Sequence, residues 1–120
     1  MSTHHVIEIV NILCALLGGV AGVIAVSRPA AFLGAGATVT SDVRLYAWLY
    51  AVRAVPLSVA AIAILLTSAW TGLVAMLLAL AVAQAGDCLL GMRRRIVGMA
   101  VGSAIAAVIH ALSAWWIATH

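Results

Sequence analysis

The sequence predicts an all-α membrane protein, an up-down bundle of four transmembrane helices with both termini on the non-cytoplasmic side. Hydrophobic residues make up 67% of the 120 positions and charged residues 8%, against about 45–50% and about 25% in soluble proteins. The apolar residues fall into four stretches of roughly 20 residues, the length that crosses a bilayer. The basic residues outside these stretches gather in two of the three connections. One domain over residues 1–120 follows, because no second hydrophobic core can be built from the remainder.

The first expected span covers residues 6–26. It ends before Pro29, which pushes the preceding residue out of helical geometry. The connection that follows is the longest in the chain. Residues 30–33 are expected to form a short turn in the membrane interface, broken by Gly34 and Gly36.

The second expected span covers residues 43–66 and contains Pro56, which removes one backbone hydrogen bond and is expected to kink the helix. N-cap oxygens precede this span at Thr40, Ser41 and Asp42. A tight uncharged turn leads to the third span, residues 71–92. A run of three arginines then separates it from the fourth, residues 96–119. Short connections of this kind are typical of up-down bundles.

The arginines predict the orientation in the membrane. The first and third connections, taken together with the first residues of the second span, contain Arg28, Arg44 and Arg93–Arg95, whereas the termini and the second connection contain no Lys or Arg. The positive-inside rule therefore places both basic connections in the cytoplasm. Trp70, Trp115 and Trp116 then belong to an outer aromatic belt. All basic residues are Arg in an Ala-, Val- and Gly-rich chain, which indicates a GC-rich bacterial genome and a bacterial cytoplasmic membrane.

Several classes of function are excluded by what the sequence lacks. No basic stripe with interleaved aromatic residues lies outside the spans, so nucleic acid is not an expected partner. Cys14 and Cys88 form no CxxC pair and are interpreted as small buried hydrophobes. No metal-ligand cluster, phosphate-binding loop or nucleophile motif is present, so we expect neither metal nor cofactor.

One ionisable residue in each apolar stretch carries the functional information: Glu8, Arg53, Asp87 and His110. A charge at bilayer depth costs about 2.5–3.5 kcal/mol on insertion scales and usually faces a bundle interior. Helical spacing and depth predict two polar layers. The inner layer pairs Arg53 with Asp87, flanked by Tyr46, Tyr50 and Gln84, and the outer layer groups His110 with Asn11 and Glu8. Ser103 lies on the same face of the fourth span as His110.

The stretch from Pro29 to His110 resembles a family of small four-span bacterial membrane proteins, the DoxX-like proteins. The residues that carry the resemblance are Pro29 with Phe32, Tyr46 or Tyr50 with Arg53, the pair Gly86–Asp87, and His110. The resemblance implies a four-helix membrane bundle. It does not fix an activity, because a fold alone does not determine function.

The favoured hypothesis is a membrane-embedded, cofactor-independent hydrolase, cyclase or isomerase that acts by general acid–base chemistry. Its substrate is a lipophilic small molecule, terpenoid- or polyketide-like, which undergoes epoxide opening, cyclisation or isomerisation. The catalytic candidates are Asp87 as base, Arg53 as its orienting cation, and Tyr50 or His110 as acid. The substrate-binding candidates are Tyr46, Gln84, Asn11 and Ser103.

Other interpretations stay open. The same residues fit a proton relay in a small transporter or channel subunit, or a register-fixing ion pair in an accessory subunit. His110 is equally consistent with a satisfied core histidine. The glycine pairs Gly18/Gly22 and Gly98/Gly102 follow the GxxxG pattern, which favours close approach of the first and fourth helices or a homodimer face.

Overall fold

The computed structural model describes residues 1–33 and 36–120, and the described residues form four long helices and no strand. The helices are α1 (Thr3–Ser27), α2 (Ser41–Leu66), α3 (Leu73–Arg93) and α4 (Val97–Thr119). A 3₁₀ turn, η1 (Pro29–Phe32), follows α1 where a short turn was expected. The expected break at Gly34 lies outside the described residues.

Local sequence explains where the helices begin. The hydroxyl of Ser2 accepts a hydrogen bond from the His5 backbone N–H and caps α1. Thr40 does the same for α2 through the backbone N–H of Val43. Both caps satisfy N–H groups that have no partner within the helix. The helix α2 continues through Pro56 as one element.

The four helices are organised as two closely packed pairs, α1 with α2 and α3 with α4, and contacts between the pairs are few. Small residues make each pair close. A Cβ atom on Gly22 would lie 3.4 Å from the Ala51 Cα, and one on Gly91 would lie 2.7 Å from the Ala100 backbone nitrogen. Glycine is needed at position 91, because a side chain there would collide with the backbone of α4 and separate the two helices.

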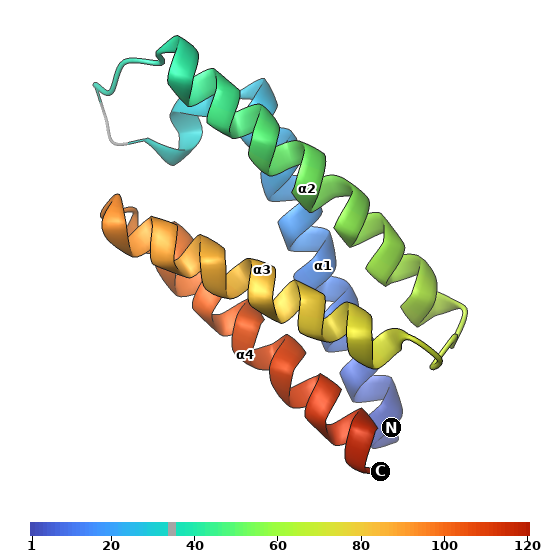
Figure 1. The fold of residues 1–120 in the computed structure, drawn as a ribbon. Helices are drawn as coiled ribbons and strands as arrows, with labels where there is room; N and C mark the ends of the chain where they lie inside the picture. Colours follow the sequence, from blue (N-terminus) through green and yellow to red (C-terminus); the bar gives the residue numbers. More distant parts are fainter. Residues whose placement is uncertain (34–35) are drawn as a thin grey trace.

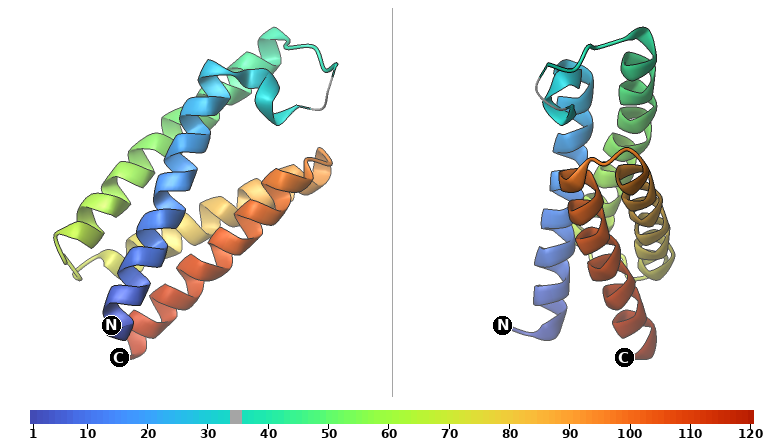
Figure 2. Two further views of the ribbon diagram at one scale, coloured as in Figure 1. Left: turned by 180° about the vertical axis from the view of Figure 1, so that it is seen from behind. Right: turned by 90° about the vertical axis from the view of Figure 1, so that its left-hand side faces the viewer.

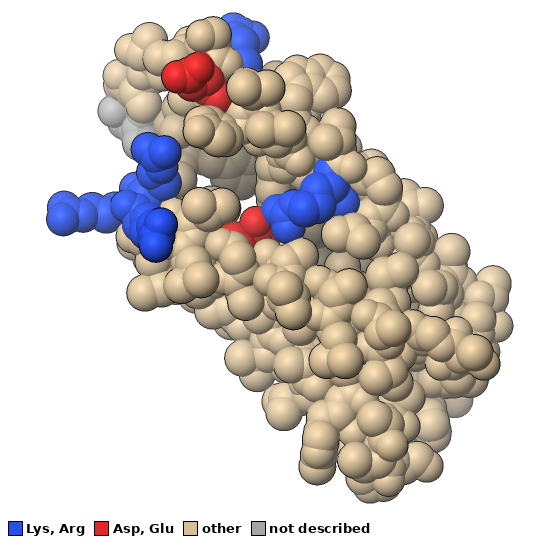
Figure 3. Space-filling view, viewed as in Figure 1, with Lys and Arg blue, Asp and Glu red and all other residues tan. Residues whose placement is uncertain are grey.

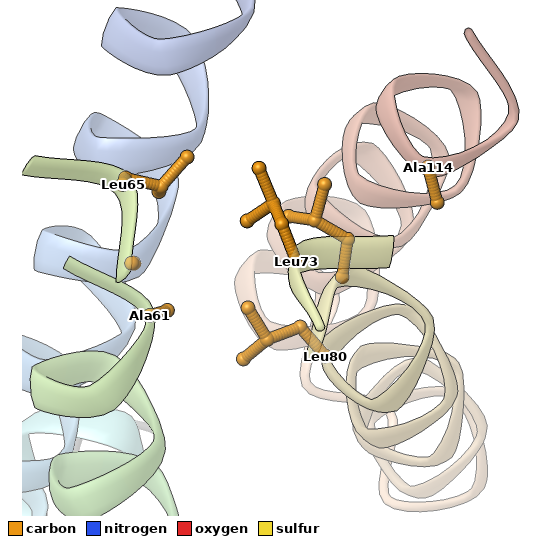
Figure 4. Packing of buried hydrophobic residues seen from close by; sticks show 7 residues of the cluster. Ala61, Leu65, Leu73, Leu80 and Ala114 are labelled. Atoms are coloured by element: carbon orange, nitrogen blue, oxygen red, sulfur yellow. The ribbon is translucent and has the colours of Figure 1, made fainter. Parts of the chain in front are cut away.

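The two pairs meet at one end of the molecule and diverge toward the other, as Figures 1 and 2 show. The closed end holds both termini and the α2–α3 turn. The open end holds η1, the start of α2 and the α3–α4 connection. The buried apolar core brings together residues from all four helices: Ala15, Ala61, Leu65, Leu73, Leu77, Leu80 and Ala114. In Figure 4, Leu73 and Leu80 extend from α3 toward Ala61 and Leu65 of α2.

Aromatic rings join three segments at the closed end. The imidazole of His4 lies edge-on to the indoles of Trp70 and Trp116, with ring centroids 5.2 Å and 5.0 Å apart. The ring of His120 stacks on Trp116 at 4.7 Å. His4 and His120 are exposed, as expected for terminal residues. The contacts of His4 nevertheless tie the start of α1 to the α2–α3 turn and to the end of α4.

Each of the four helices is long and apolar enough to cross a membrane. Large apolar side chains remain exposed on every helix, among them Leu17, Val59, Val82 and Ile105. A soluble protein rarely leaves so much contiguous apolar surface in water, whereas lipid solvates it. The architecture is therefore that of a multi-pass membrane protein built as a four-helix bundle.

Candidate functional site

An ion pair between α2 and α3 joins the two helix pairs. The Nη2 of Arg53 donates a hydrogen bond to Oδ1 of Asp87, and the two atoms are 2.5 Å apart. The Asp87 side chain is almost fully buried, whereas that of Arg53 is 39% exposed. The guanidinium also lies over the ring of Tyr50, 5.6 Å from its centroid and one helical turn earlier. The pairing that spacing predicted is confirmed.

The second carboxylate oxygen of Asp87, Oδ2, has no hydrogen-bond partner among the described residues. Every side-chain oxygen or nitrogen atom that is fully buried in the described part of the chain does have a hydrogen-bond partner, so Oδ2 is not fully buried. Oδ2 therefore reaches open space. Asp87 also lines a cavity of about 20 Å³, room for about one water molecule. Its polar lining comes from Tyr50, Arg53, Ser58, Gln84 and Asp87.

The cavity lies where α1, α2 and α3 meet. Gly18 forms its α1 wall, and a Cβ atom there would lie 3.6 Å from the Ser58 hydroxyl and 3.7 Å from the Gln84 amide nitrogen. Figure 3 shows the surface hollowed between the two helix pairs, with acidic and basic side chains in contact at the edge of the hollow. A molecule in the hollow can therefore reach the Arg53–Asp87 ion pair, and the ion pair in turn borders the cavity.

A second polar cluster joins α1 to α4. Asn11 is 0% and His110 1% exposed, so both are more deeply buried than the ion pair. The Nδ2 of Asn11 donates to Ser113 Oγ and to the Ile7 carbonyl, each at 2.7 Å, and its Oδ1 lies 2.7 Å from His110 Nδ1. The predicted grouping of Asn11 with His110 is confirmed, and Ser113 joins it.

These contacts determine which imidazole nitrogen carries the proton. A backbone carbonyl only accepts hydrogen bonds, so the Asn11 amide must present its nitrogen to Ile7 and its oxygen to His110. Two acceptors cannot pair, so Nδ1 of His110 is a donor. Among the described residues Nε2 of His110 has no hydrogen-bond partner. Since every fully buried side-chain nitrogen there has one, Nε2 is not fully buried and, like Oδ2, reaches open space.

The apolar core separates the two polar clusters. One face of α1 carries Asn11, Ala15 and Gly18. Asn11 belongs to the buried polar cluster, Ala15 to the apolar core, and Gly18 to the wall of the cavity. Seven steps of helical rise separate Asn11 from Gly18, which corresponds to roughly 10 Å. Leu77 and Leu80 of α3 lie in the same core. Arg53 was expected to be long enough to bridge the two layers, but its hydrogen bond goes to Asp87.

The structure brings together only part of the predicted set. Tyr50, Arg53, Gln84 and Asp87 share the cavity, whereas Asn11 and His110 form the separate cluster. Tyr46 is 62% exposed and is not among the cavity-lining residues. Ser103 is half-buried on α4, outside both clusters, and Glu8 is half-buried near the start of α1.

Sequence reasoning missed two residues that matter for the structure and misjudged the contacts of the glycine pairs. Ser58 lines the cavity, and its signal was a lone hydroxyl on the small-residue face of α2, one helical turn after Ala54. Gly91 makes the tightest α3–α4 approach although it belongs to no GxxxG pattern. The expected approach of the first and fourth helices through both glycine pairs is wrong, since Gly22 packs on α2 and, among the described residues, no atom lies within 4 Å of a Cβ on Gly98 or Gly102.

Comparison with known proteins finds no family model, no curated protein and no solved structure that matches this chain. The DoxX-like resemblance stays a prediction. Within the described residues no three His, Cys, Asp or Glu side chains gather where they would hold a metal ion.

Proposed function

We propose that this chain is a membrane-embedded, cofactor-independent enzyme that acts on a lipophilic small molecule by general acid–base chemistry at Asp87. One observation carries the proposal: Oδ2 of the largely buried Asp87 has no partner among the described residues, and Asp87 lines a water-sized cavity near the hollow between the two helix pairs. A buried carboxylate with one oxygen held and one free is suited to accept a proton.

The geometry supports distinct roles for the neighbouring groups. Arg53 holds Oδ1 and fixes the orientation of the Asp87 carboxylate. A water in the cavity lies within reach of Oδ2, while the substrate occupies the hollow. For an epoxide, the water oxygen forms the new C–O bond, its proton passes to Asp87, and the oxygen leaving the ring takes a proton from Tyr50. The Tyr50 phenolate then regains a proton from Asp87 through water, so both groups return to their starting states and the net reaction adds one water. Tyr50 carries the acid role because it lines the cavity, which His110 does not.

The proposal includes an arrangement in the membrane. The open end, with Arg28, Arg44 and Arg93–Arg95, faces the cytoplasm of a bacterium, and the closed end with both termini faces outward in an up-down topology. Cysteine substitutions at Arg94 and at Ser2, in a variant whose Cys14 and Cys88 are Ser, test this by labelling intact cells with a membrane-impermeant maleimide. Labelling at position 2 and not at 94 is expected.

A proton-coupled transporter is the second candidate, favoured by the opening of the helix pairs at one end only. A transporter that alternates between open ends has such a state. The apolar core between the two polar clusters weighs against a continuous proton path. An accessory subunit, or a homodimer through Gly98/Gly102, would need neither the cavity nor the free carboxylate oxygen.

The test uses the purified full chain in phosphatidylcholine nanodiscs with 9,10-epoxystearate, its methyl ester and squalene epoxide in ¹⁸O-labelled water. Incorporation of ¹⁸O is followed by mass spectrometry for wild type, Asp87→Asn and the control Ser103→Ala. We expect labelled diol from wild type and the control only. Full turnover by a folded Asp87→Asn variant would refute the mechanism.

A further inference from the structure

The Arg53 guanidinium has unused hydrogen-bonding capacity at bilayer depth. Arginine presents five N–H donors in a fixed fork, and among the described residues only Nη2 donates a hydrogen bond, to Asp87. The side chain is 39% exposed. Nothing in lipid hydrocarbon accepts these hydrogens, so the exposed donors need a partner.

We propose that the free donors of Arg53 bind the anionic head of a single-chain amphiphile, a carboxylate or phosphate whose apolar tail lies in the hollow between the two helix pairs. This rests on the proposed function and names the class of its substrate. The fork geometry of guanidinium matches both oxyanions. The Tyr50 ring beneath the guanidinium holds it in place, which reduces the entropy lost when an anion binds.

The surroundings of Arg53 fit a molecule with an apolar tail. The cavity lining includes Ala54, Leu57, Leu80 and Ala83 beside the polar groups. The hollow opens between the two helix pairs, so a lipid-soluble chain can enter it sideways from the bilayer. A head group anchored on Arg53 would place the adjoining carbon atoms beside Oδ2 of Asp87.

Charge at the open end favours an anion over a neutral lipid. Five of the six arginines lie in the segments at this end, against the single acidic residue Asp42, which leaves a local net charge of +4. The charges of Arg53 and Asp87 cancel each other, so the net charge of +4 at the open end decides the sign of the electrostatic potential there. A positive field at the mouth of a low-dielectric cleft raises the local concentration of anions.

The experiment measures binding to the full chain by native mass spectrometry, with oleate, oleoyl lysophosphatidic acid, methyl oleate and inorganic phosphate as probes. We expect oleate and the lysophospholipid to bind at least roughly tenfold more tightly than methyl oleate, the effect of losing a charge-assisted hydrogen bond. Inorganic phosphate, which has no tail, should bind more weakly than either. Equal binding of oleate and methyl oleate, or of phosphate and oleate, would overturn the proposal.

Variants assign the binding to Arg53. Arg53→Gln is expected to weaken oleate binding at least roughly tenfold, and Arg53→Lys, which keeps the charge without the fork, by less. If Arg53→Gln does not fold, the double variant Arg53→Gln/Asp87→Asn replaces it. The control Arg44→Gln lowers the surplus at the open end from +4 to +3 and should weaken oleate binding far less than Arg53→Gln does, and an equal loss there would contradict the assignment.

Asp87→Asn separates this proposal from the mechanism above. The variant should bind oleate at least as tightly as wild type, because the carboxylate that competes for the guanidinium is gone, while its turnover is lost. Unchanged binding with unchanged turnover refutes the acid–base mechanism and leaves the oxyanion site standing. Lost turnover together with no preference for anions refutes the oxyanion site alone.

Discussion

Replacing Asn11 by Leu tests the buried cluster that holds α1 against α4. The substitution removes two interhelical hydrogen bonds, one with His110 Nδ1 and one with Ser113 Oγ, both 2.7 Å long. Interhelical hydrogen bonds in membrane proteins contribute about 0.6 kcal/mol on average, which gives about 1.2 kcal/mol for the two. The His110 N–H, on a residue 1% exposed, is left without an acceptor at a further cost of about 1–3 kcal/mol.

The expected loss in the free energy of unfolding is therefore about 2–4 kcal/mol. The Ser113 hydroxyl causes no further loss of stability in this variant, because it can turn and donate a hydrogen bond to a backbone carbonyl of its own helix. Steric trapping or unfolding in mixed micelles measures the change on the purified chain. Ser27→Ala is the matched control, since its hydroxyl on the same helix is exposed and bonds only to nearby backbone carbonyls.

A double variant gives a second measurement of the same cluster. Asn11→Leu/His110→Leu should recover part of the stability lost in Asn11→Leu, because removing both partners leaves no unsatisfied donor. The reasoning fails if Asn11→Leu unfolds within about 0.5 kcal/mol of Ser27→Ala. It also fails if the double variant loses as much stability as the two single changes added together.

Three further substitutions probe the helix pairs, the ion pair and the cavity. Gly91→Ala should lower the unfolding free energy by about 1–3 kcal/mol, because the new Cβ would lie 2.7 Å and 3.0 Å from backbone atoms of α4. Gly98→Ala is the control and should leave the unfolding free energy unchanged, because no described atom lies within 4 Å of its Cβ. Arg53→Leu should lower it by about 1–3 kcal/mol, less than for a fully buried pair, and Arg53→Leu/Asp87→Leu should restore it; a double variant less stable than Arg53→Leu would contradict this. Gly18→Ala fits sterically but narrows the cavity, so turnover of epoxystearate should fall by roughly tenfold or more with stability unchanged.

Much of the candidate site could be predicted because helical geometry is regular. Spacing of three or four residues and a constant rise along the axis place Arg53 opposite Asp87, and Asn11 opposite His110, once the chain crosses the membrane in alternating directions. The same rules placed Tyr46 beside Arg53, although its side chain is exposed. Tyr46 does lie on the Arg53 face, since seven residues turn a helix by almost two full turns. It is exposed because it lies near the start of α2, at the end of the molecule where the two helix pairs diverge.

The sequence by itself determined the number of helices and the position of each ionisable group along its helix, since hydrophobic length and residue rise depend only on order along one chain. Tertiary structure alone decided which helices pack closely. The glycine patterns pointed to α1 and α4, whereas Gly22 packs on α2 and Gly91 on α4. It also decided that apolar residues separate the two polar clusters and that Asp87 keeps a free oxygen. These features depend on how the two pairs rotate and diverge, which a pattern within a single helix does not specify.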